Sequence, residues 1–252
     1  MVRRCLHDPC IEYDNMHKAI ENIPENVALI PDGNRRWARN HRMTLLSGYS
    51  LGVKKAIDFG IWLKSLGVKT FTVWALSTEN LNNRNRTELN VLYRLYVKTA
   101  RDKKVLDLLA KNGARVKVIG NMALLPRNVS RALKSLESRT KRYKDFTINL
   151  LIAYSGKEDI LHAAKALVYN AVRERQRRIT EALLNSRLRT AAIPEPDLII
   201  RTSGELRLSG FMPWQSSYSE LYFTKKYWPD FSKSDLNRAI SEFSRRKRRY
   251  GG

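Results

Sequence analysis

The chain has 252 residues, enough for one α/β domain with a sizeable core and too few for two full domains. Hydrophobic residues make up 43% and aromatic residues 9%, which excludes a disordered chain. A formal charge of +23, from 47 Lys and Arg against 24 Asp and Glu, predicts an anionic partner: nucleic acid, an acidic membrane face or a phosphorylated substrate.

Residues 1–26 are polar and lack a sustained periodicity, so we expect an N-terminal arm. Cys5 and Cys10 lie in it; a metal site is one reading, but reduced thiols fit two cysteines without a second paired motif better. The sequence shows no signal-peptide pattern and no run of about 18 apolar residues. The expected location is the cytoplasm, at most peripheral to a membrane.

From Val27 onward, short β-branched runs alternate with helical patterns. The predicted strands are 27–30, 69–76, 114–120, 146–153, 197–202 and 220–223, and the predicted helices are 47–66, 86–112, a stretch after Pro126, 157–190 and a stretch from 232. This alternation predicts a single α/β domain over 27–252, with a mainly parallel six-stranded sheet and helices on both faces. In such sheets ligands bind beyond the carboxyl ends of the strands.

The helix predicted over 86–112 is long for a globular domain and carries apolar residues at helical spacing, among them Leu92, Tyr96 and Leu109. The simpler interpretation is a face of the core. The alternative is the wall of a tunnel for an apolar substrate.

The first strand is followed by Asp32, Gly33, Asn34, Arg35 and Arg36. Glycine permits a close backbone approach, and a helix N-terminus followed by arginines can hold phosphate oxygens. The aspartate would repel a phosphate unless Mg²⁺ lay between them, which is a common way of binding Mg²⁺. The alternative is an Asp N-cap with solvated arginines.

Two further strand ends carry polar residues. Ser77, Thr78, Glu79 and Asn80 follow the second strand and suit substrate orientation or proton transfer, although a capping box would also explain them. The strand over 197–202 leads into a candidate anion site made of Arg201, Arg207 and Ser209, and Glu220 follows as a second carboxylate for the metal.

Familiar phosphate motifs do not account for these residues. The sequence has no GxxxxGK[ST] loop and no GxGxxG after the first strand, which argues against a P-loop hydrolase and a dinucleotide fold. It also lacks the DDxxD pairs of all-α prenyl synthases.

From Val27 to Gly252 the sequence resembles the cis-prenyltransferase family, the undecaprenyl and dehydrodolichyl diphosphate synthases. The resemblance rests on "DGNRRWA", "LSTEN", "DLIIRTSGELRLSGFMPWQ", "YSELYF" and the closing "RRYGG". It implies a Mg²⁺-dependent homodimer that condenses an allylic prenyl diphosphate with isopentenyl diphosphate to make a cis-polyprenyl diphosphate.

The resemblance also implies roles for individual residues. Asp32 would hold Mg²⁺ and assist departure of the allylic pyrophosphate, and Asn80 would take part in proton removal. The donor would be cradled by Gly33, Asn34, Arg35, Arg36 and Trp37, with Ser77, Thr78 and Glu79 lining the site. Isopentenyl diphosphate would be bound by Arg201, Arg207, Leu208 and Ser209. Glu220 would be the second metal-linked carboxylate, and Arg249 and Gly251 would reach the site near the dimer interface.

Several positions depart from the family pattern. Leu45 and Tyr49 stand where typical bacterial members have arginine and histidine, and Leu81 and Asn83 stand where they have tryptophan and arginine. All four are donor-side positions, so an atypical donor or a different acceptor is the alternative function. Arg42 and Arg84 lie nearby in sequence and are candidates to replace the missing arginines.

A third hypothesis about function, based on the high positive charge, is a non-catalytic basic subunit or a nucleic-acid binder. Asp32 argues against an inactive subunit, because such subunits typically lack that aspartate. The near absence of aromatic residues among the basic runs 173–189 and 245–249 argues against nucleic acid. The charge fits peripheral contact with an anionic membrane better.

Overall fold

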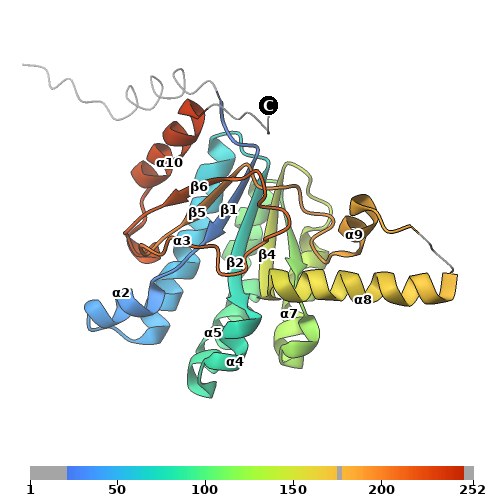
Figure 1. The fold of residues 1–252 in the computed structure, drawn as a ribbon. Helices are drawn as coiled ribbons and strands as arrows, with labels where there is room; N and C mark the ends of the chain where they lie inside the picture. Colours follow the sequence, from blue (N-terminus) through green and yellow to red (C-terminus); the bar gives the residue numbers. More distant parts are fainter. Residues whose placement is uncertain (1–21, 175–177, 247–252) are drawn as a thin grey trace, which may run out of the picture.

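The computed structural model describes residues 22–174 and 178–246 and contains one six-stranded sheet (Figure 1). Its strands are β1 (Asn26–Ile30), β2 (Thr70–Ser77), β3 (Ala114–Ile119), β4 (Phe146–Tyr154), β5 (Leu198–Arg201) and β6 (Glu220–Phe223). They lie in the order β3-β4-β2-β1-β5-β6, and every neighbouring pair is parallel. The predicted parallel sheet is confirmed.

The helices lie between the strands in sequence. They are α2 (Asn34–Asn40), α3 (Leu45–Ser65), α4 (Thr78–Asn83), α5 (Arg86–Arg101), α6 (Lys103–Lys111), α7 (Arg127–Thr140), α8 (Gly156–Glu174), α9 (Glu181–Arg187) and α10 (Lys233–Arg245). Two short 3₁₀ turns, η1 (Met122–Leu124) and η2 (Trp228–Asp230), complete the elements.

The single helix predicted over 86–112 is wrong, because the chain breaks at Asp102. This residue has an extended backbone (φ −65°, ψ 120°), and its Oδ1 accepts a hydrogen bond of 2.8 Å from the amide of Lys104, which caps α6. The apolar spacing continues across the break, so periodicity did not reveal it.

The region predicted as helical over 157–190 also contains two helices. Thr180 has an extended backbone and caps α9, since its Oγ1 accepts from the amide of Leu183 at 3.2 Å. In Figure 1, α8 extends sideways from the sheet with α9 above it.

The two faces of the sheet are buried in different cores. Val27 and Leu29 point into the larger core with α3, α5, α6, α7 and α10, whereas Ala28 and Ile30 point to the opposite face. There they pack with Phe211 and with other apolar residues of the segment that flanks β5. The alternation follows from the two-residue period of a strand.

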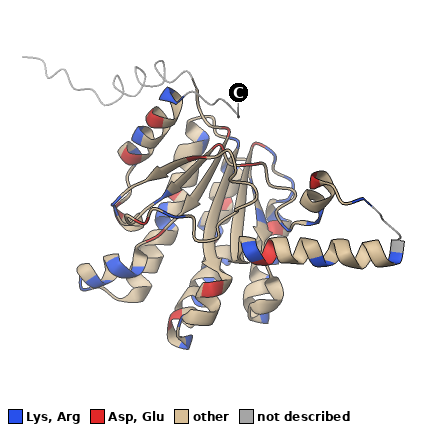
Figure 2. Cartoon of the chain, viewed as in Figure 1, with Lys and Arg blue, Asp and Glu red and all other residues tan. Residues whose placement is uncertain are grey.

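The charged residues are distributed over many elements. Figure 2 shows Lys and Arg on α2, α3, α8 and α10 rather than on a single face. Within the described ranges, no helix combines the length and apolar character needed to cross a bilayer. Most of the predicted arm, with Cys5 and Cys10, lies outside the described residues.

Candidate active site

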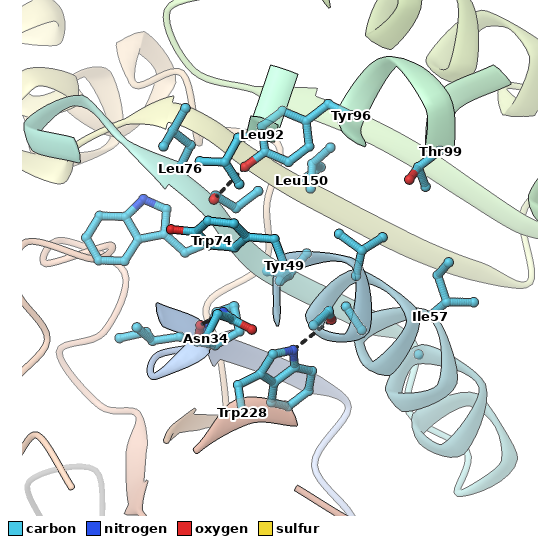
Figure 3. A pocket seen from close by; sticks show the side chains of 18 of the residues that line it. Asn34, Tyr49, Ile57, Trp74, Leu76, Leu92, Tyr96, Thr99, Leu150 and Trp228 are labelled. Atoms are coloured by element: carbon cyan, nitrogen blue, oxygen red, sulfur yellow. Dashed lines mark hydrogen bonds between the residues drawn. The ribbon is translucent and has the colours of Figure 1, made fainter. Parts of the chain in front are cut away.

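A cavity of about 1070 Å³ lies between the sheet and the helices α3, α5, α6 and α7 (Figure 3). One stripe of α3 lines its whole length: Leu45, Tyr49, Gly52, Val53, Ala56, Ile57, Gly60, Ile61 and Lys64. At 1.5 Å per residue this stripe is roughly 28 Å long. The cavity therefore runs from the carboxyl edge of the sheet to its amino edge.

Helices α5 and α6 form another wall of the cavity. Leu92, Tyr96 and Ala100 of α5 and Leu108 and Leu109 of α6 line it. Most of these side chains also belong to the hydrophobic core. Both interpretations of the 86–112 pattern thus hold: this face is part of the core, and it is also the wall of an elongated apolar cavity.

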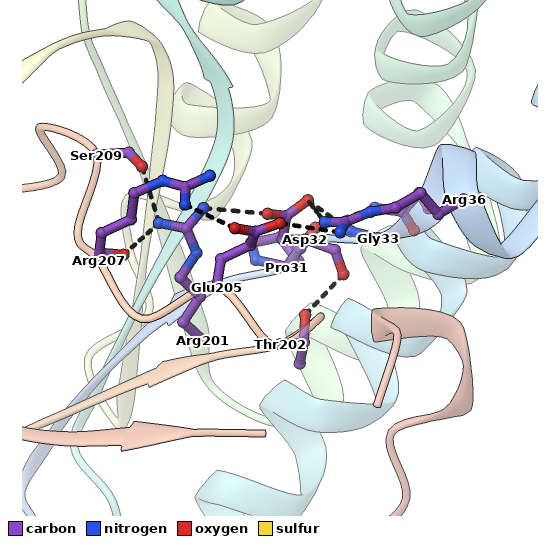
Figure 4. Close-up of polar contacts among 10 residues, drawn as sticks. Pro31, Asp32, Gly33, Arg36, Arg201, Thr202, Glu205, Arg207 and Ser209 are labelled. Carbon is purple, nitrogen blue, oxygen red and sulfur yellow. Dashed lines mark hydrogen bonds and ion pairs between the residues drawn. The ribbon is translucent and has the colours of Figure 1, made fainter. Parts of the chain in front are cut away.

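Asp32 lies at the mouth of the cavity, directly after β1 (Figure 4). Its carbonyl accepts from the Thr202 hydroxyl at 2.7 Å and from the Trp228 amide at 3.0 Å, so the backbone is fixed. Oδ2 pairs with Nη2 of Arg201 at 3.1 Å, and Oδ1 lies 3.4 Å from Nη2 of Arg36. The carboxylate is thus oriented by two arginines and only partly exposed.

The turn after β1 depends on glycine. Gly33 has φ of +101° and is the N-cap of α2, so the alternative of an Asp32 N-cap is wrong. Its amide donates to Oδ1 of Asp32 at 2.7 Å. A Cβ on Gly52 would lie 2.2 Å from Oδ1 of Asn34, so a glycine there lets α3 approach the start of α2 closely.

Arg36 and Arg207 reach toward one another from the two sides of the mouth and share Glu205. Nη1 of Arg36 lies 2.9 Å from one Glu205 oxygen, and Nη1 of Arg207 lies 2.6 Å from the other. The hydrogen bond from Arg36 and the charge of Arg207 lower the pKa of Glu205. Glu205 thus pairs with two arginines whose guanidinium groups are suited to binding a diphosphate.

Arg201 links Asp32 to the loop that carries Arg207 and Ser209. Its Nη1 donates to the Ser209 hydroxyl at 2.9 Å and to the Arg207 carbonyl. Arg201 is 5% exposed, and its Nε has no hydrogen-bond partner among the described residues. A guanidinium that lines a cavity and is held in place by such contacts is suited to binding an anion.

The segment after β2 lies on another side of the mouth. Ser77, Glu79 and Asn80 line the cavity, and Ser77 also caps α4 by accepting from the amide of Asn80 at 3.0 Å. Burial raises the pKa of Glu79, but hydrogen bonds from its own backbone amide and from Ser155 outweigh this, and the pKa is lowered. Glu79 thus remains a charged acceptor.

Tyr49, Arg84 and Glu88 form a buried cluster at the mouth. Oε1 of Glu88 accepts from the Tyr49 hydroxyl at 2.6 Å and lies 3.2 Å from Nε of Arg84. Of the two arginines expected to substitute on the donor side, Arg84 lines the cavity, whereas Arg42 is absent from its lining.

Five of the predicted substrate-binding residues do not line the cavity: Trp37, Thr78, Leu81, Asn83 and Leu208. Trp37 is buried, stacks on His41 and donates to Oδ1 of Asp230 at 2.6 Å, so it supports the turn instead. Leu81 and Leu208 pack against hydrophobic clusters. The structure therefore does not place these five side chains against the cavity.

The structure does not bring Glu220 to Asp32 within one chain, contrary to the expected shared metal site. Glu220 begins β6 and pairs in register with Leu198, whereas Asp32 follows Ile30, which pairs with Arg201. The two carboxylates therefore lie at opposite edges of the sheet. Glu220 pairs instead with Arg246 at 2.6 Å. Arg249 and Gly251 lie outside the described residues.

Three residues at the mouth escaped the sequence analysis: Arg39, Glu88 and Glu205. Glu205 stands in the quoted motif "DLIIRTSGELRLSG", where its position between arginines was a usable signal. Glu88 gave none, since a Glu in the first turn of a helix is an ordinary feature.

The residues present fit a Mg²⁺ ion that arrives with a diphosphate. Asp32 offers carboxylate oxygens, and no cluster of three or more His, Cys, Asp or Glu within 22–174 and 178–246 could hold a metal alone. Mg²⁺ is usually bound by one or two carboxylates together with substrate phosphates and water. The single aspartate is therefore compatible with it.

Comparisons with known proteins agree with this geometry. A family model described as "Putative undecaprenyl diphosphate synthase" matches residues 30–251. The chain is 42% identical to the tritrans,polycis-undecaprenyl-diphosphate synthase (geranylgeranyl-diphosphate specific) of Methanopyrus kandleri, over 91% of this chain and 85% of that one. It is 40% identical to the isoprenyl transferase of Aquifex pyrophilus, over 91% and 96% of the two chains.

Solved structures show the same similarity. The lavandulyl diphosphate synthase of Lavandula x intermedia, in complex with dimethylallyl diphosphate, has a TM-score of 0.86 at 34% identity and covers 91% of this chain and 99% of its own. A probable undecaprenyl diphosphate synthase from Campylobacter jejuni has a TM-score of 0.75 at 28% identity, with coverages of 92% and 100%.

Proposed function

The chain belongs to the undecaprenyl diphosphate synthase family of cis-prenyltransferases, and we propose from its geometry how it transfers a prenyl group. It is a transferase that condenses an allylic prenyl diphosphate with isopentenyl diphosphate and makes a cis-polyprenyl diphosphate. The observation that carries this proposal is the meeting of Asp32 with Arg36, Arg201 and Arg207 at the mouth of an elongated apolar cavity.

The proposed reaction begins with cleavage of the bond between the allylic carbon and the pyrophosphate oxygen. Arg35 and Arg36 hold the leaving pyrophosphate, while Arg201, Arg207 and Ser209 hold the second diphosphate. The double bond of isopentenyl diphosphate attacks the allylic carbon, and loss of a proton leaves the new double bond. Guanidinium groups fixed before the reaction stabilise the charge that develops on pyrophosphate.

Asp32 would hold Mg²⁺ in this proposal, and the ion would supply further neutralisation of the leaving pyrophosphate. Arg201 keeps the carboxylate oriented toward the mouth. Asn80 lines the cavity next to the charged Glu79 and takes part in removal of the proton. The apolar cavity encloses the prenyl chain and excludes water from the allylic cation.

We also propose that the chain forms a homodimer, with α8 as part of its interface. Leu161, Val168, Tyr169 and Val172 lie on one face of α8, and all four are exposed, Val172 to 78%. An exposed apolar stripe of this kind marks an interaction surface. The formal charge of +23 supports peripheral contact of the dimer with an anionic membrane.

The alternative in which the prenyl acceptor differs is favoured by one comparison. The similar lavandulyl diphosphate synthase is named for a product other than a polyprenyl diphosphate. The experiment that separates the two offers a panel of allylic diphosphates with labelled isopentenyl diphosphate and Mg²⁺, followed by mass analysis. A longer labelled lipid supports elongation, whereas pyrophosphate release that needs some other prenyl acceptor supports the alternative.

The variant Asp32→Ala is a control for that panel, because it separates the transferase from a basic binding protein. Salt-dependent binding to nucleic acid that survives the change Asp32→Ala, without product from any primer, would support the basic-binder interpretation. Chain elongation by the wild type that Asp32→Ala abolishes would support the transferase proposal.

A further inference from the structure

Glu88 is a buried carboxylate at the cavity mouth that the proposed reaction leaves without a role. It is 4% exposed, and it lies in the first turn of α5, where its backbone amide donates to the Asn85 side chain at 2.8 Å. A carboxylate buried to this degree is costly unless it is paired. The groups that contact the Glu88 carboxylate indicate its role.

Both Glu88 oxygens contact groups from other elements. Oε1 accepts from Tyr49 of α3 and pairs with Nε of Arg84, as described above, and Oε2 lies 3.4 Å from Nη1 of Arg35 of α2. Burial raises the pKa of the Tyr49 hydroxyl, so this group stays protonated and donates. Glu88 thus joins α2, α3 and the turn before α5 at one point.

The contact between Arg84 and Glu88 is made by Nε of the guanidinium, 3.2 Å from Oε1. Among the described residues the terminal nitrogens of Arg84 make no hydrogen bond, and its side chain is 16% exposed and lines the cavity. The guanidinium also lies 5.8 Å from the centre of the Tyr49 ring, which limits its rotation. These terminal donors are therefore available to a ligand anion in the cavity.

We propose that Glu88 is a positioning residue for the allylic diphosphate: it anchors Arg84 and Arg35 so that their free donors converge on the diphosphate at the mouth. This rests on the proposed function. Arg201 and Arg207 belong to the other diphosphate and have no contact with Glu88, so the effect is confined to one substrate. Glu88 itself touches no reacting atom.

The test is the change Glu88→Gln, which keeps the shape and an acceptor for Tyr49 but removes the charge that holds both arginines. We expect the KM for the allylic diphosphate, and the Kd for an unreactive thio-analogue of it, to rise about tenfold or more. The KM for isopentenyl diphosphate should change less than about twofold, a split that a purely structural role would not produce.

A matched control is Glu158→Gln. Glu158 also pairs with an arginine, Arg189 at 3.3 Å, but it lies on α8 and outside the cavity lining. This variant should keep wild-type values for both substrates. Thermal unfolding of both variants separates a loss of fold from a loss of binding.

A double-mutant cycle of Glu88→Gln with Arg84→Met tests whether Glu88 acts through Arg84. If Glu88→Gln folds poorly, Arg84→Met alone still tests the binding of the analogue. Arg84→Met alone should weaken the analogue about tenfold, and adding it to Glu88→Gln should weaken it little further. Fully additive losses, equal increases in both KM values, or an unchanged analogue Kd in Glu88→Gln would each overturn the proposal. Failure of the wild type to bind any allylic analogue would instead overturn the proposed function.

Discussion

Nη2 of Arg201 lies 3.1 Å from Oδ2 of Asp32, and this ion pair joins the two segments proposed to bind the diphosphates, which follow the neighbouring strands β1 and β5. Arg201 also donates to Ser209 on the far side of the mouth. A single buried guanidinium thus fixes the carboxylate proposed to hold Mg²⁺ relative to the loop proposed to bind the second substrate. The relative placement of two anions is what a condensation between two diphosphates requires.

The first prediction concerns Asp32. Asp32→Asn keeps the size of the side chain but removes the charge that would hold Mg²⁺, so kcat should fall by at least about 10²-fold. Steady-state rates over a Mg²⁺ titration measure this. Asp107→Asn, on the exposed face of α6, is the control and should leave the rate unchanged. A rate within a few-fold of wild type in Asp32→Asn would remove this residue from the mechanism.

The second prediction separates the two substrates. Arg207 is largely exposed and pairs with Glu205, so Arg207→Met should fold normally and lose a charged donor. We expect the KM for isopentenyl diphosphate to rise about tenfold, with little change in the KM for the allylic substrate. Initial rates with each substrate varied in turn provide the measurement. An increase confined to the allylic substrate would reverse the assignment of the two sites.

The sequence could predict the elements that carry their own periodicity. The strands around Leu29 and Ile200 are short, buried and rich in β-branched residues. Their parallel direction could be predicted because helices separate the strands in the sequence. The break at Asp102 could not be predicted, because a capping aspartate interrupts the backbone without interrupting the apolar spacing.

Contacts between distant segments were harder to predict than strand ends. Asp32 follows β1, Arg201 ends β5 and Ser209 lies on the loop after β5, so the rule for parallel sheets brought them together. Glu88 contacts Tyr49 of α3 and Arg84 at the end of α4, and these contacts depend on how separate helices pack together. Glu220 was expected beside Asp32, but within one chain it begins a strand and therefore lies at the opposite edge of the sheet from residues that follow one.

The third prediction concerns stability and pH. Burial alone would raise the pKa of Asp235 in α10, but hydrogen bonds from Ser232, Lys226 and Arg238 lower it from 3.8 to about 2. Because the pKa of Asp235 is lower in the folded state, its charged carboxylate stabilises the fold at pH values above its unfolded pKa. This stabilisation is lost as the pH falls through about 2. The pKa shift corresponds to about 2 kcal/mol of stability at neutral pH.

Asp235→Asn should therefore lower the free energy of unfolding by about 2 kcal/mol at pH 7 and by much less near pH 2. Denaturant unfolding of wild type and variant at both pH values measures the difference. Asp107→Asn again serves as the control, because no hydrogen bond or ion pair of its side chain is seen among the described residues. A loss that is equal at the two pH values would show that the carboxylate charge is not the cause.

The fourth prediction concerns the length of the product. Lys64 is the last cavity residue on α3, at the amino edge of the sheet, and its ammonium donates to the carbonyl of Asn112. A growing apolar chain that reaches this end meets a charged group that it cannot solvate, which disfavours further elongation. Lys64→Leu should therefore shift the products upward by one or more isoprene units, as measured by mass analysis.

The control for that experiment is Lys55→Leu. Lys55 lies on the same helix but outside the cavity lining, with its ammonium 5.6 Å from the centre of the Trp62 ring. Removing this lysine changes the charge of α3 equally and should leave the products unchanged. Because Lys64 lines the cavity and Lys55 does not, a shift in both variants would point to the charge of α3. A shift in neither would place the limit on product length elsewhere along the cavity wall.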